Sequence, residues 1–265
     1  MAHRTLKQTT NVIVPPFDRR WALFLDVDGT LVDFVEHPER VKASPRLIDV
    51  VREVFRLSGG SVALVSGRAI ASVDAIFEPL RLPIAGLHGQ ERRDAIGRTR
   101  RASAEAQLFI DVRERFRPVM ARHPGMFIEE KGATIALHYR AAPGAAEDVE
   151  KLAEELEAQL PEPFRVQRGK MVVEILSCDR SKGTAIEAFM SEPPFTGRIP
   201  VFVGDDTTDE HGFRWVNEHD GISIKVGSGS SLARVRFEGV AQVVSWIEDY
   251  AVFLKNAEGA VGHDS

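Results

Sequence analysis

The stretch Trp21-Ala22-Leu23-Phe24-Leu25-Asp26-Val27-Asp28-Gly29-Thr30 joins a compact apolar run to a short acidic segment. Five consecutive apolar residues predict a strand that is buried on both faces, as the central strands of parallel sheets are. Asp26 follows the strand directly. Asp28 leaves on the same side if the extended backbone persists for one more step, and Gly29 permits the turn that comes next. The stretch therefore predicts a central strand that ends in a pair of carboxylates.

Working outward, short apolar runs alternate with amphipathic segments. A helix is predicted to begin at Ser44-Pro45, with the serine as N-cap and the proline in the first turn, and to end at Gly59-Gly60. Strands at 61–65 and 83–87 flank a second helix at 70–80. The order strand, helix, strand, helix, strand predicts a parallel sheet with right-handed crossovers.

The alternation stops in the middle of the chain and returns after residue 179. The middle segment reads as a helix at 108–119, strands at 126–130 and 133–140, a helix at 149–160 and strands at 164–168 and 171–176. The elements predicted after it are a helix at 181–190, a strand at 199–203, a helix at 209–217, a strand at 221–226 and a helix at 240–254. We therefore expect a polar tail at 1–15, a doubly wound core of 16–91 and 178–265, and an inserted α+β unit at 92–177.

Composition limits the function classes. The chain has 265 residues, is 43% hydrophobic and 28% charged, and carries a net charge of −5, which disfavours a general nucleic-acid binder. A single cysteine, Cys178, excludes an internal disulfide framework, and we expect a cytoplasmic protein. We see neither a signal peptide nor a membrane-spanning segment, and we expect a monomer.

Two further motifs stand where predicted strands end or helices begin. Ser66-Gly67-Arg68 follows the second strand, and a serine hydroxyl with neighbouring amides at a helix start suits a phosphate oxygen. A plain N-cap would explain the same residues. Ser181-Lys182-Gly183 places a lysine in a first helical turn, where the dipole disfavours a cation. That position is sensible for holding an anion, although a solvated lysine is the simpler alternative.

The last motif is Gly204-Asp205-Asp206-Thr207-Thr208-Asp209-Glu210, directly after an apolar run. Four acidic residues here could form a capped helix start, but their place at a strand end favours a metal site. In open α/β sheets this edge is where ligands bind.

Taken together and in this order, the four motifs resemble the haloacid dehalogenase superfamily of phosphotransferases. The resemblance covers about residues 20–90 and 178–250. It implies a doubly wound parallel-sheet (Rossmann-like) α/β core with an inserted α+β cap domain, and an Mg²⁺-dependent phosphomonoester hydrolase.

The resemblance also implies a role for each motif residue. Asp26 is then the nucleophile that forms an aspartyl phosphate, and Asp28 the general acid and base. Ser66 and Lys182 are expected to hold the phosphoryl oxygens, and Arg68 to bind substrate. Mg²⁺ is expected on Asp26, Asp205 and the backbone carbonyl of Asp28. The residues expected to have an indirect or water-mediated role at the metal are Asp206 and Asp209.

Strings in the inserted unit are similar to the cap of trehalose-6-phosphate phosphatases. They are Glu129-Glu130-Lys131-Gly132, Leu137-His138-Tyr139-Arg140 and Gly169-Lys170-Met171-Val172-Val173-Glu174-Ile175, together with Gly86-Leu87-His88-Gly89 and the full string 204–210 in the core. This similarity implies that Glu129, Lys131 and Glu174 bind sugar hydroxyls when the cap closes. The alternative is a purely structural role, in which the two glutamates face solvent and Lys131 belongs to a hairpin turn.

Three rival functions stay open at this point. A phosphatase for another sugar phosphate, such as sucrose 6-phosphate or mannosyl-3-phosphoglycerate, would share the core, and only the cap strings favour trehalose 6-phosphate. A sugar-phosphate mutase would need a cap adapted to a bisphosphate. A non-catalytic sugar-phosphate sensor should have lost an essential carboxylate or the lysine, yet Asp26, Asp28, Lys182 and Asp205 are all present.

Overall fold

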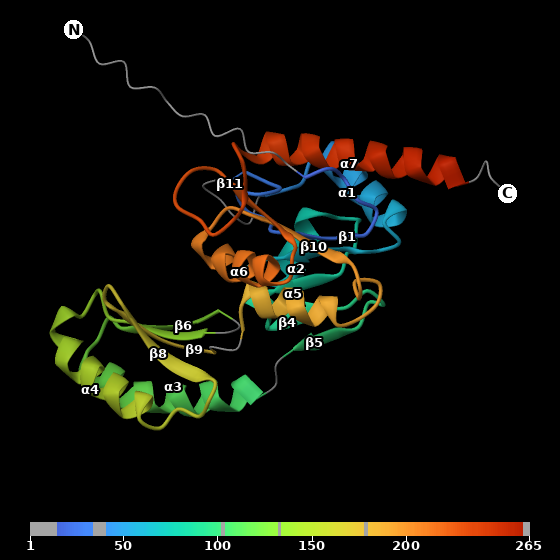
Figure 1. Cartoon of the computed structure of the whole chain (residues 1–265). Helices are drawn as coiled ribbons and strands as arrows, with labels where there is room; N and C mark the ends of the chain where they lie inside the picture. Colours follow the sequence, from blue (N-terminus) through green and yellow to red (C-terminus); the bar gives the residue numbers. More distant parts are fainter. Residues whose placement is uncertain (1–14, 34–40, 102–103, 132–133, 178–179, 262–265) are drawn as a thin grey trace, which may run out of the picture.

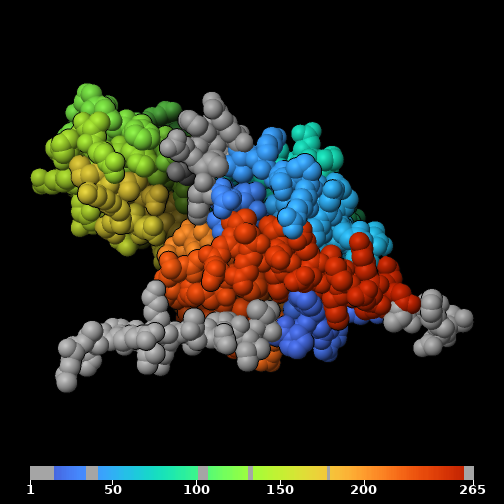
Figure 2. Space-filling model, turned by 90° about the horizontal axis from the view of Figure 1, so that it is seen from above, coloured from blue at the N-terminus to red at the C-terminus, as the bar shows by residue number. Residues whose placement is uncertain are grey.

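The computed structural model describes residues 15–33, 41–101, 104–131, 134–177 and 180–261. The predicted tail at 1–15 thus lies almost wholly outside the described residues, as does Cys178. The described strands form two sheets, one of eight strands and one of four. We call the part built on the larger sheet the core and the part built on the smaller sheet the cap. They lie beside each other in Figure 1, and in Figure 2 the cap is a green and yellow lobe next to the core.

The larger sheet has the order β12-β11-β10-β1-β2-β3-β4-β5, and all pairs from β12 to β3 are parallel. Its parallel strands are β1 (Trp21–Leu25), β2 (Val62–Val65), β3 (Ile84–Gly86), β10 (Ile199–Gly204), β11 (Ile222–Val226) and β12 (Val235–Phe237). The chain winds from β1 through β2 to β3 on one side, and later from β10 through β11 to β12 on the other. The winding reverses between β1 and β10, so the ligand crevice is expected at their carboxyl ends.

Every residue of β1 is buried, because helices cover both faces of the sheet. Trp21, Leu23 and Leu25 pack in one cluster with residues of α1 (Pro45–Leu57), α2 (Ile70–Ile76) and α7 (Val240–Val261). Ala22 and Phe24 pack in another cluster with α5 (Lys182–Met190) and α6 (Glu210–Glu218). This alternation explains the unbroken apolar run and confirms the predicted doubly wound core.

Where the sequence carries a local signal for the start of a helix, the structure has the predicted element at that position. Ser44 caps α1, with its Oγ accepting a hydrogen bond from the Leu47 amide at 3.2 Å, and Pro45 lies in the first turn as predicted. The sequence did not predict β12, nor the antiparallel hairpin of β4 (Glu91–Arg93) and β5 (Thr99–Arg101).

In the sequence, the short segments that form the β4–β5 hairpin are rich in arginine, which is typical of a basic, solvated linker. On β4, tertiary contacts hold an arginine in place: Arg93 donates two hydrogen bonds to Asp74, at 2.9 and 2.8 Å. The hairpin extends the core sheet beyond β3, so the predicted cap boundary at residue 92 falls inside β4. The division into domains stays a prediction.

The cap is an antiparallel sheet of order β6-β7-β9-β8 with helices on one face. Its elements are α3 (Ala104–Arg122), β6 (Phe127–Lys131), β7 (Thr134–His138), α4 (Ala146–Glu157), β8 (Phe164–Gly169) and β9 (Val172–Ser177). In Figure 1 the two helices lie on the side of this sheet that is turned away from the core. The predicted α+β insertion is therefore confirmed, with its uncovered sheet face toward the core side. In the part of the chain that the structure describes, no helix is both long and apolar enough to span a bilayer.

Candidate active site

A cavity of about 480 Å³ opens at the carboxyl ends of the core strands. It draws residues from all four sequence motifs, which lie far apart along the chain. Its lining consists of Asp26, Asp28, Gly67, Arg68, His88, Lys182, Asp205, Asp206 and Thr208. The fold thus gathers most of the predicted core site residues at one place, between β1 and β10 where the winding of the sheet reverses.

Lys182 is the centre of a buried network of charges. Its Nζ lies 2.7 Å from Asp26 Oδ1 and 2.7 Å from Asp209 Oδ1, and the three residues are 3%, 4% and 0% exposed. Burial raises the pKa of Asp26 to about 6 and that of Asp209 to about 6, although Lys182 works against the rise. Burial alone would lower the pKa of Lys182, but the two carboxylates raise it above its ordinary value. The ammonium group is thus kept charged between two acids.

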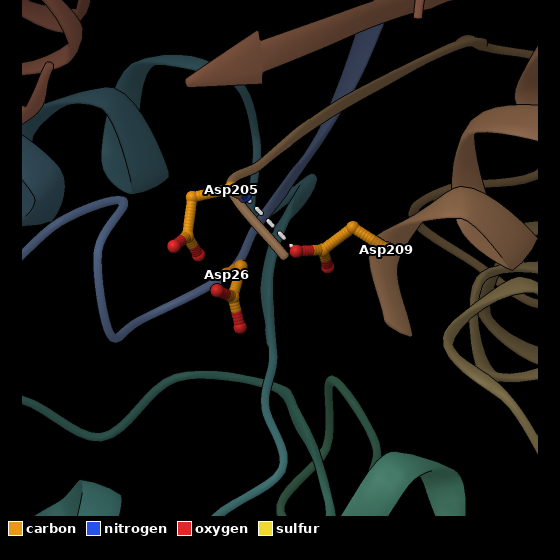
Figure 3. A group of neighbouring side chains, drawn as sticks. All are labelled: Asp26, Asp205 and Asp209. Carbon is orange, nitrogen blue, oxygen red and sulfur yellow. Dashed lines mark hydrogen bonds between the residues drawn. The ribbon is translucent and has the colours of Figure 1, made fainter. Parts of the chain in front are cut away.

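Three carboxylates, those of Asp26, Asp205 and Asp209, converge at this place, as Figure 3 shows. Oxygen atoms of Asp26, Asp205 and Asp209 lie within 4.8 Å of one another. Thr30 Oγ1 is 3.5 Å from both Asp26 Oδ2 and Asp205 Oδ1. Burial raises the pKa of Asp205 as well. Carboxylates this close repel one another, and a hard divalent cation with oxygen ligands relieves that repulsion.

Both carboxylate oxygens of Asp209 accept hydrogen bonds within the protein. Oδ1 accepts from Lys182, and Oδ2 accepts from the backbone amides of Asp205 and Asp206 at 3.0 and 2.9 Å. Asp26 and Asp205 are therefore the better pair to hold a cation, and Asp209 fixes the lysine and the loop that carries Asp205. The donor set fits a divalent cation on Asp26 and Asp205.

Asp28 and Arg68, predicted as the acid–base residue and a substrate ligand, are paired with each other. Arg68 Nε lies 2.6 Å from Asp28 Oδ2, and Nη2 lies 2.7 Å from Oδ1. Both side chains are part-buried, at 19% and 26% exposed. Such a two-point pairing of guanidinium and carboxylate is strong and directional. In this arrangement both Asp28 oxygens are engaged by the arginine.

Ser66 directly follows β2 and is not among the described residues that line the cavity. It is 1% exposed, and its Oγ accepts a hydrogen bond from the Arg68 amide at 3.1 Å. Its predicted contact with a phosphoryl oxygen stays a prediction. Next to it, a Cβ on Gly67 would lie 2.9 Å from the His88 ring, so glycine is needed for this close approach.

Sequence reasoning gave no role at the site to Thr30 or Lys225, and it left His88 out as a catalyst although the histidine lines the cavity. Leu87 and His88 have positive φ angles of 50° and 57°, which are uncommon outside glycine and occur at functional sites. Burial, with the nearby Lys182 charge, lowers the pKa of His88. Lys225 is 6% exposed and donates to the backbone oxygens of Asp205 and Val226, so it supports the Asp205 loop. A lysine inside an apolar strand was the signal that could have pointed to it.

A sequence model for the trehalose-phosphatase family matches residues 24–238, which is most of the chain. The chain belongs to the trehalose-phosphatase family. It is 42% identical over 234 residues to the trehalose-6-phosphate phosphatase of Escherichia coli K12, with 88% of each chain covered. It is 44% identical over 207 residues to a probable trehalose-phosphate phosphatase of Sinorhizobium fredii, with 78% of each covered.

Solved structures of this family share the fold. Trehalose-6-phosphate phosphatase of Aspergillus fumigatus superimposes with a TM-score of 0.70 at 24% identity, over 89% of this chain and 98% of that one. A phosphatase of the haloalkanoate superfamily from Bacteroides thetaiotaomicron gives 0.55 at 17% identity, over 92% and 100%. The core with an inserted cap is thus an architecture that this chain shares with solved phosphatases.

The residues predicted to bind the sugar belong to strands of the cap sheet. Glu129 on β6 and Glu174 on β9 are both level with Ala136 on β7, so they share the uncovered face of the cap sheet. His138 Nε2 lies 3.0 Å from Glu129 Oε2, and its ring stacks on Phe127. Lys131 ends β6, and only its backbone is described. Glu129 and Glu174 are not among the described residues that line the core cavity.

Proposed function

We propose that the protein hydrolyses trehalose 6-phosphate to trehalose and phosphate with Mg²⁺ as cofactor. The observation that carries the proposal is the buried contact of Lys182 with Asp26, set beside Asp205 at the ligand edge of the sheet. Such a site combines a shielded nucleophile, a fixed cation for phosphoryl oxygens and oxygen ligands for a metal. The 42% identity to a trehalose-6-phosphate phosphatase supports the substrate.

Asp26, Asp205 and the backbone carbonyl of Asp28 would hold the metal in this proposal. Bound Mg²⁺ supplies positive charge that offsets the charge on the phosphoryl oxygens. Asp209 keeps Lys182 in place, and the exposed Asp206 caps the turn that follows Asp205. Ser66, at the start of the neighbouring loop, would complete the set of phosphoryl contacts.

The chemistry then divides into two transfers. A carboxylate oxygen of Asp26 bonds to phosphorus while the bond from phosphorus to the sugar oxygen breaks, and protonated Asp28 gives its proton to that oxygen. Water next attacks the phosphorus of the aspartyl phosphate, Asp28 accepts a proton from that water, and phosphate leaves with Asp26 restored.

The first transfer requires that the ion pair between Asp28 and Arg68 breaks. Arg68 occupies both Asp28 oxygens, so the guanidinium has to turn toward another anion before Asp28 can address the sugar oxygen. A phosphoryl group entering the cavity provides that anion, because Arg68 lines the same cavity. This exchange gives Arg68 its substrate-binding role.

We further propose that Glu129, Lys131 and Glu174 bind sugar hydroxyls after the cap has closed over the core. Carboxylates and ammonium groups suit a ligand with many hydroxyls. We place the cap at residues 104–177, after the β4–β5 hairpin that belongs to the core sheet. A cytoplasmic monomer without nucleic-acid or membrane partners accords with the single cysteine and the net charge of −5.

A panel of phosphate esters tests the function. Phosphate release is measured from trehalose 6-phosphate, sucrose 6-phosphate, glucose 6-phosphate and an aryl phosphate, each with Mg²⁺ and with a chelator. We expect a strong preference for trehalose 6-phosphate and no release with the chelator. Equal, slow release from all esters would reject the cap assignment and retain a phosphatase. No release from any ester would favour a sugar-phosphate sensor.

A further inference from the structure

His88 lines the candidate active-site cavity shortly after β3, and the two transfers proposed for Asp26 and Asp28 leave it without a task. Its ring makes no hydrogen bond with the described residues, and its ring nitrogens are not among the shielded polar atoms of that part of the chain. Solvent in the cavity therefore reaches these nitrogens. An imidazole that is open in this way is available to the molecule that enters the cavity.

The backbone at His88 adopts a conformation that few residues other than glycine accept. Leu87 and His88 have φ angles of 50° and 57°. Two backbone hydrogen bonds hold them there, from the Leu87 amide to the Arg68 oxygen at 3.0 Å and from the His88 amide to the Ser66 oxygen at 3.1 Å. Strained residues that their surroundings hold in place are concentrated at ligand sites. The strain here places one particular side chain in the cavity wall.

Close packing fixes the ring from both sides. A Cβ on Gly67 would lie 2.9 Å from atoms of the His88 ring, so the loop after β2 lies directly against the imidazole. A Cβ on Gly89 would lie 3.2 Å from Ala185 Cβ, so the start of α5 lies against the other side of the segment. The same loop and the same helix carry the two cationic residues of the site, and the imidazole is therefore held between them.

The ring is uncharged at neutral pH. Burial, with the nearby charge of Lys182, lowers the pKa of His88. A neutral imidazole offers one hydrogen-bond donor and one acceptor. Phosphoryl oxygens only accept hydrogen bonds, and Lys182 and Arg68 are cationic donors suited to them. A sugar hydroxyl both donates and accepts, so it matches the neutral imidazole better.

We propose that His88 binds a hydroxyl group of the sugar ring that carries the phosphate. This inference rests on the proposed function and adds a substrate-binding residue to it. The cavity of about 480 Å³ lies within the roughly 300–1,000 Å³ that small-molecule sites span, so it has room for a sugar ring beside a phosphoryl group. Glu129 and Glu174 are then left for the second ring, and the core and the cap recognise different halves of the disaccharide.

The test compares initial rates of the full-length protein and its variants, with Mg²⁺, on trehalose 6-phosphate, glucose 6-phosphate and an aryl phosphate. The variants are His88→Asn and His88→Gln. Asparagine accepts the left-handed backbone, but its amide stops short of the position of His Nε2, whereas the glutamine amide reaches that position. The matched control is His211→Asn, an exposed histidine on α6 that is not among the described residues lining the cavity.

We expect His88→Asn to lower kcat/KM roughly tenfold for both sugar phosphates, mainly by raising KM, and His88→Gln to lower it less. The aryl phosphate has no hydroxyl for His88, so its rate should equal that of the parent, as should all rates of His211→Asn. An equal fall for the aryl phosphate would assign His88 to the phosphoryl group or to folding and overturn the proposal. Parental rates with both sugar phosphates, or a fall confined to trehalose 6-phosphate, would overturn it as well.

Calorimetric binding in a chelator separates this inference from the proposed function. Should the parent release no phosphate from trehalose 6-phosphate, the proposed function fails. Weaker binding of glucose 6-phosphate by His88→Asn than by the parent, with inorganic phosphate bound equally by both, would then still support the hydroxyl contact. Equal binding of glucose 6-phosphate by both proteins, or no binding by the parent, overturns it.

Discussion

The core cavity and the uncovered face of the cap sheet hold their carboxylates in opposite ways. In the core, Asp26 and Asp209 are 4% and 0% exposed and share one buried lysine at 2.7 Å from each. On the cap, Glu129 and Glu174 stand on an open sheet face, and the Glu129 side chain is 36% exposed. The first set is preorganised by burial, whereas the second set lies on a sheet face that solvent reaches.

This difference separates reactivity from selectivity. Groups that are buried and locked by ion pairs need no reorganisation when charge develops during the reaction. Groups on an exposed face gain their full strength only when a ligand and a closing cap remove water from them. Substitutions in the core should therefore affect turnover and folding for every substrate, whereas substitutions on the cap should affect the choice of substrate.

The largest effect is expected for Asp26→Asn. Loss of the nucleophile should lower turnover of all esters by roughly 10⁴-fold or more. The fold should persist, because asparagine has nearly the shape of aspartate and its amide oxygen can still accept the hydrogen bond from Lys182. Phosphate release and thermal melting measure the two effects, with the exposed Asp49→Asn on α1 as control. Near-normal turnover would remove Asp26 from the nucleophile role.

Asp209→Ala should have the next largest effect, on stability. The change leaves buried Lys182 with one carboxylate and two backbone amides without an acceptor, so we expect a loss of roughly 3 kcal/mol or more. The free energy of unfolding, obtained from denaturant titration of the parent and the variant, measures this loss. The matched control is Asp206→Ala, an exposed N-cap in the same turn, for which about 1 kcal/mol is expected. Equal losses in both variants would show that the buried network is not what stabilises this loop.

The cap substitutions Glu129→Gln and Glu174→Gln should each lower kcat/KM for trehalose 6-phosphate by about 10- to 100-fold, since each weakens charged hydrogen bonds to sugar hydroxyls. The aryl phosphate, which offers no such hydroxyls, should react at the parent rate.

Glu130→Gln is the matched control for these cap variants. Glu130 is next to Glu129 on β6, but it is level with the buried Ile135, so it belongs to the opposite face, where Arg113 binds it. In the Glu130→Gln variant, kcat/KM for trehalose 6-phosphate and for the aryl phosphate should equal the parent values. An equal fall in rate for trehalose 6-phosphate and the aryl phosphate in the Glu129 and Glu174 variants would instead assign these residues to cap folding.

The smallest effect is expected for an exposed ion pair of the cap. The hydrogen bond from His123 to Asp148, at 2.7 Å, lowers the pKa of Asp148. A lowered acid pKa contributes stability above the unfolded value of about 3.9 and loses it as the pH falls through the folded value. The difference in thermal unfolding midpoint between the parent and Asp148→Asn should thus shrink as the pH falls below about 4. A difference that grows below about pH 4 would contradict this assignment.

Local chemistry predicted much of the core. The apolar run 21–25, the Ser44-Pro45 helix start and the residue type at each strand end are local features, and the structure has a strand, a capped helix and a ligand edge there. The arginines of β4, Arg92 and Arg93, show the limit of prediction from local sequence. Nothing local distinguishes them from a solvated linker, because their partners Asp74 and Glu192 lie about 20 and 100 residues away.

By itself the sequence determined which groups could do chemistry, since Asp26, Asp28, Lys182 and Asp205 stand next to predicted strand and helix ends. Only the tertiary structure decided how they are used. It buried Lys182 between two acids, paired Asp28 with Arg68, engaged both oxygens of Asp209, and placed Lys225 behind Asp205. The physical reason is that burial, distance and partner identity set the charge and freedom of an ionisable group, and these depend on segments that meet only in the folded chain.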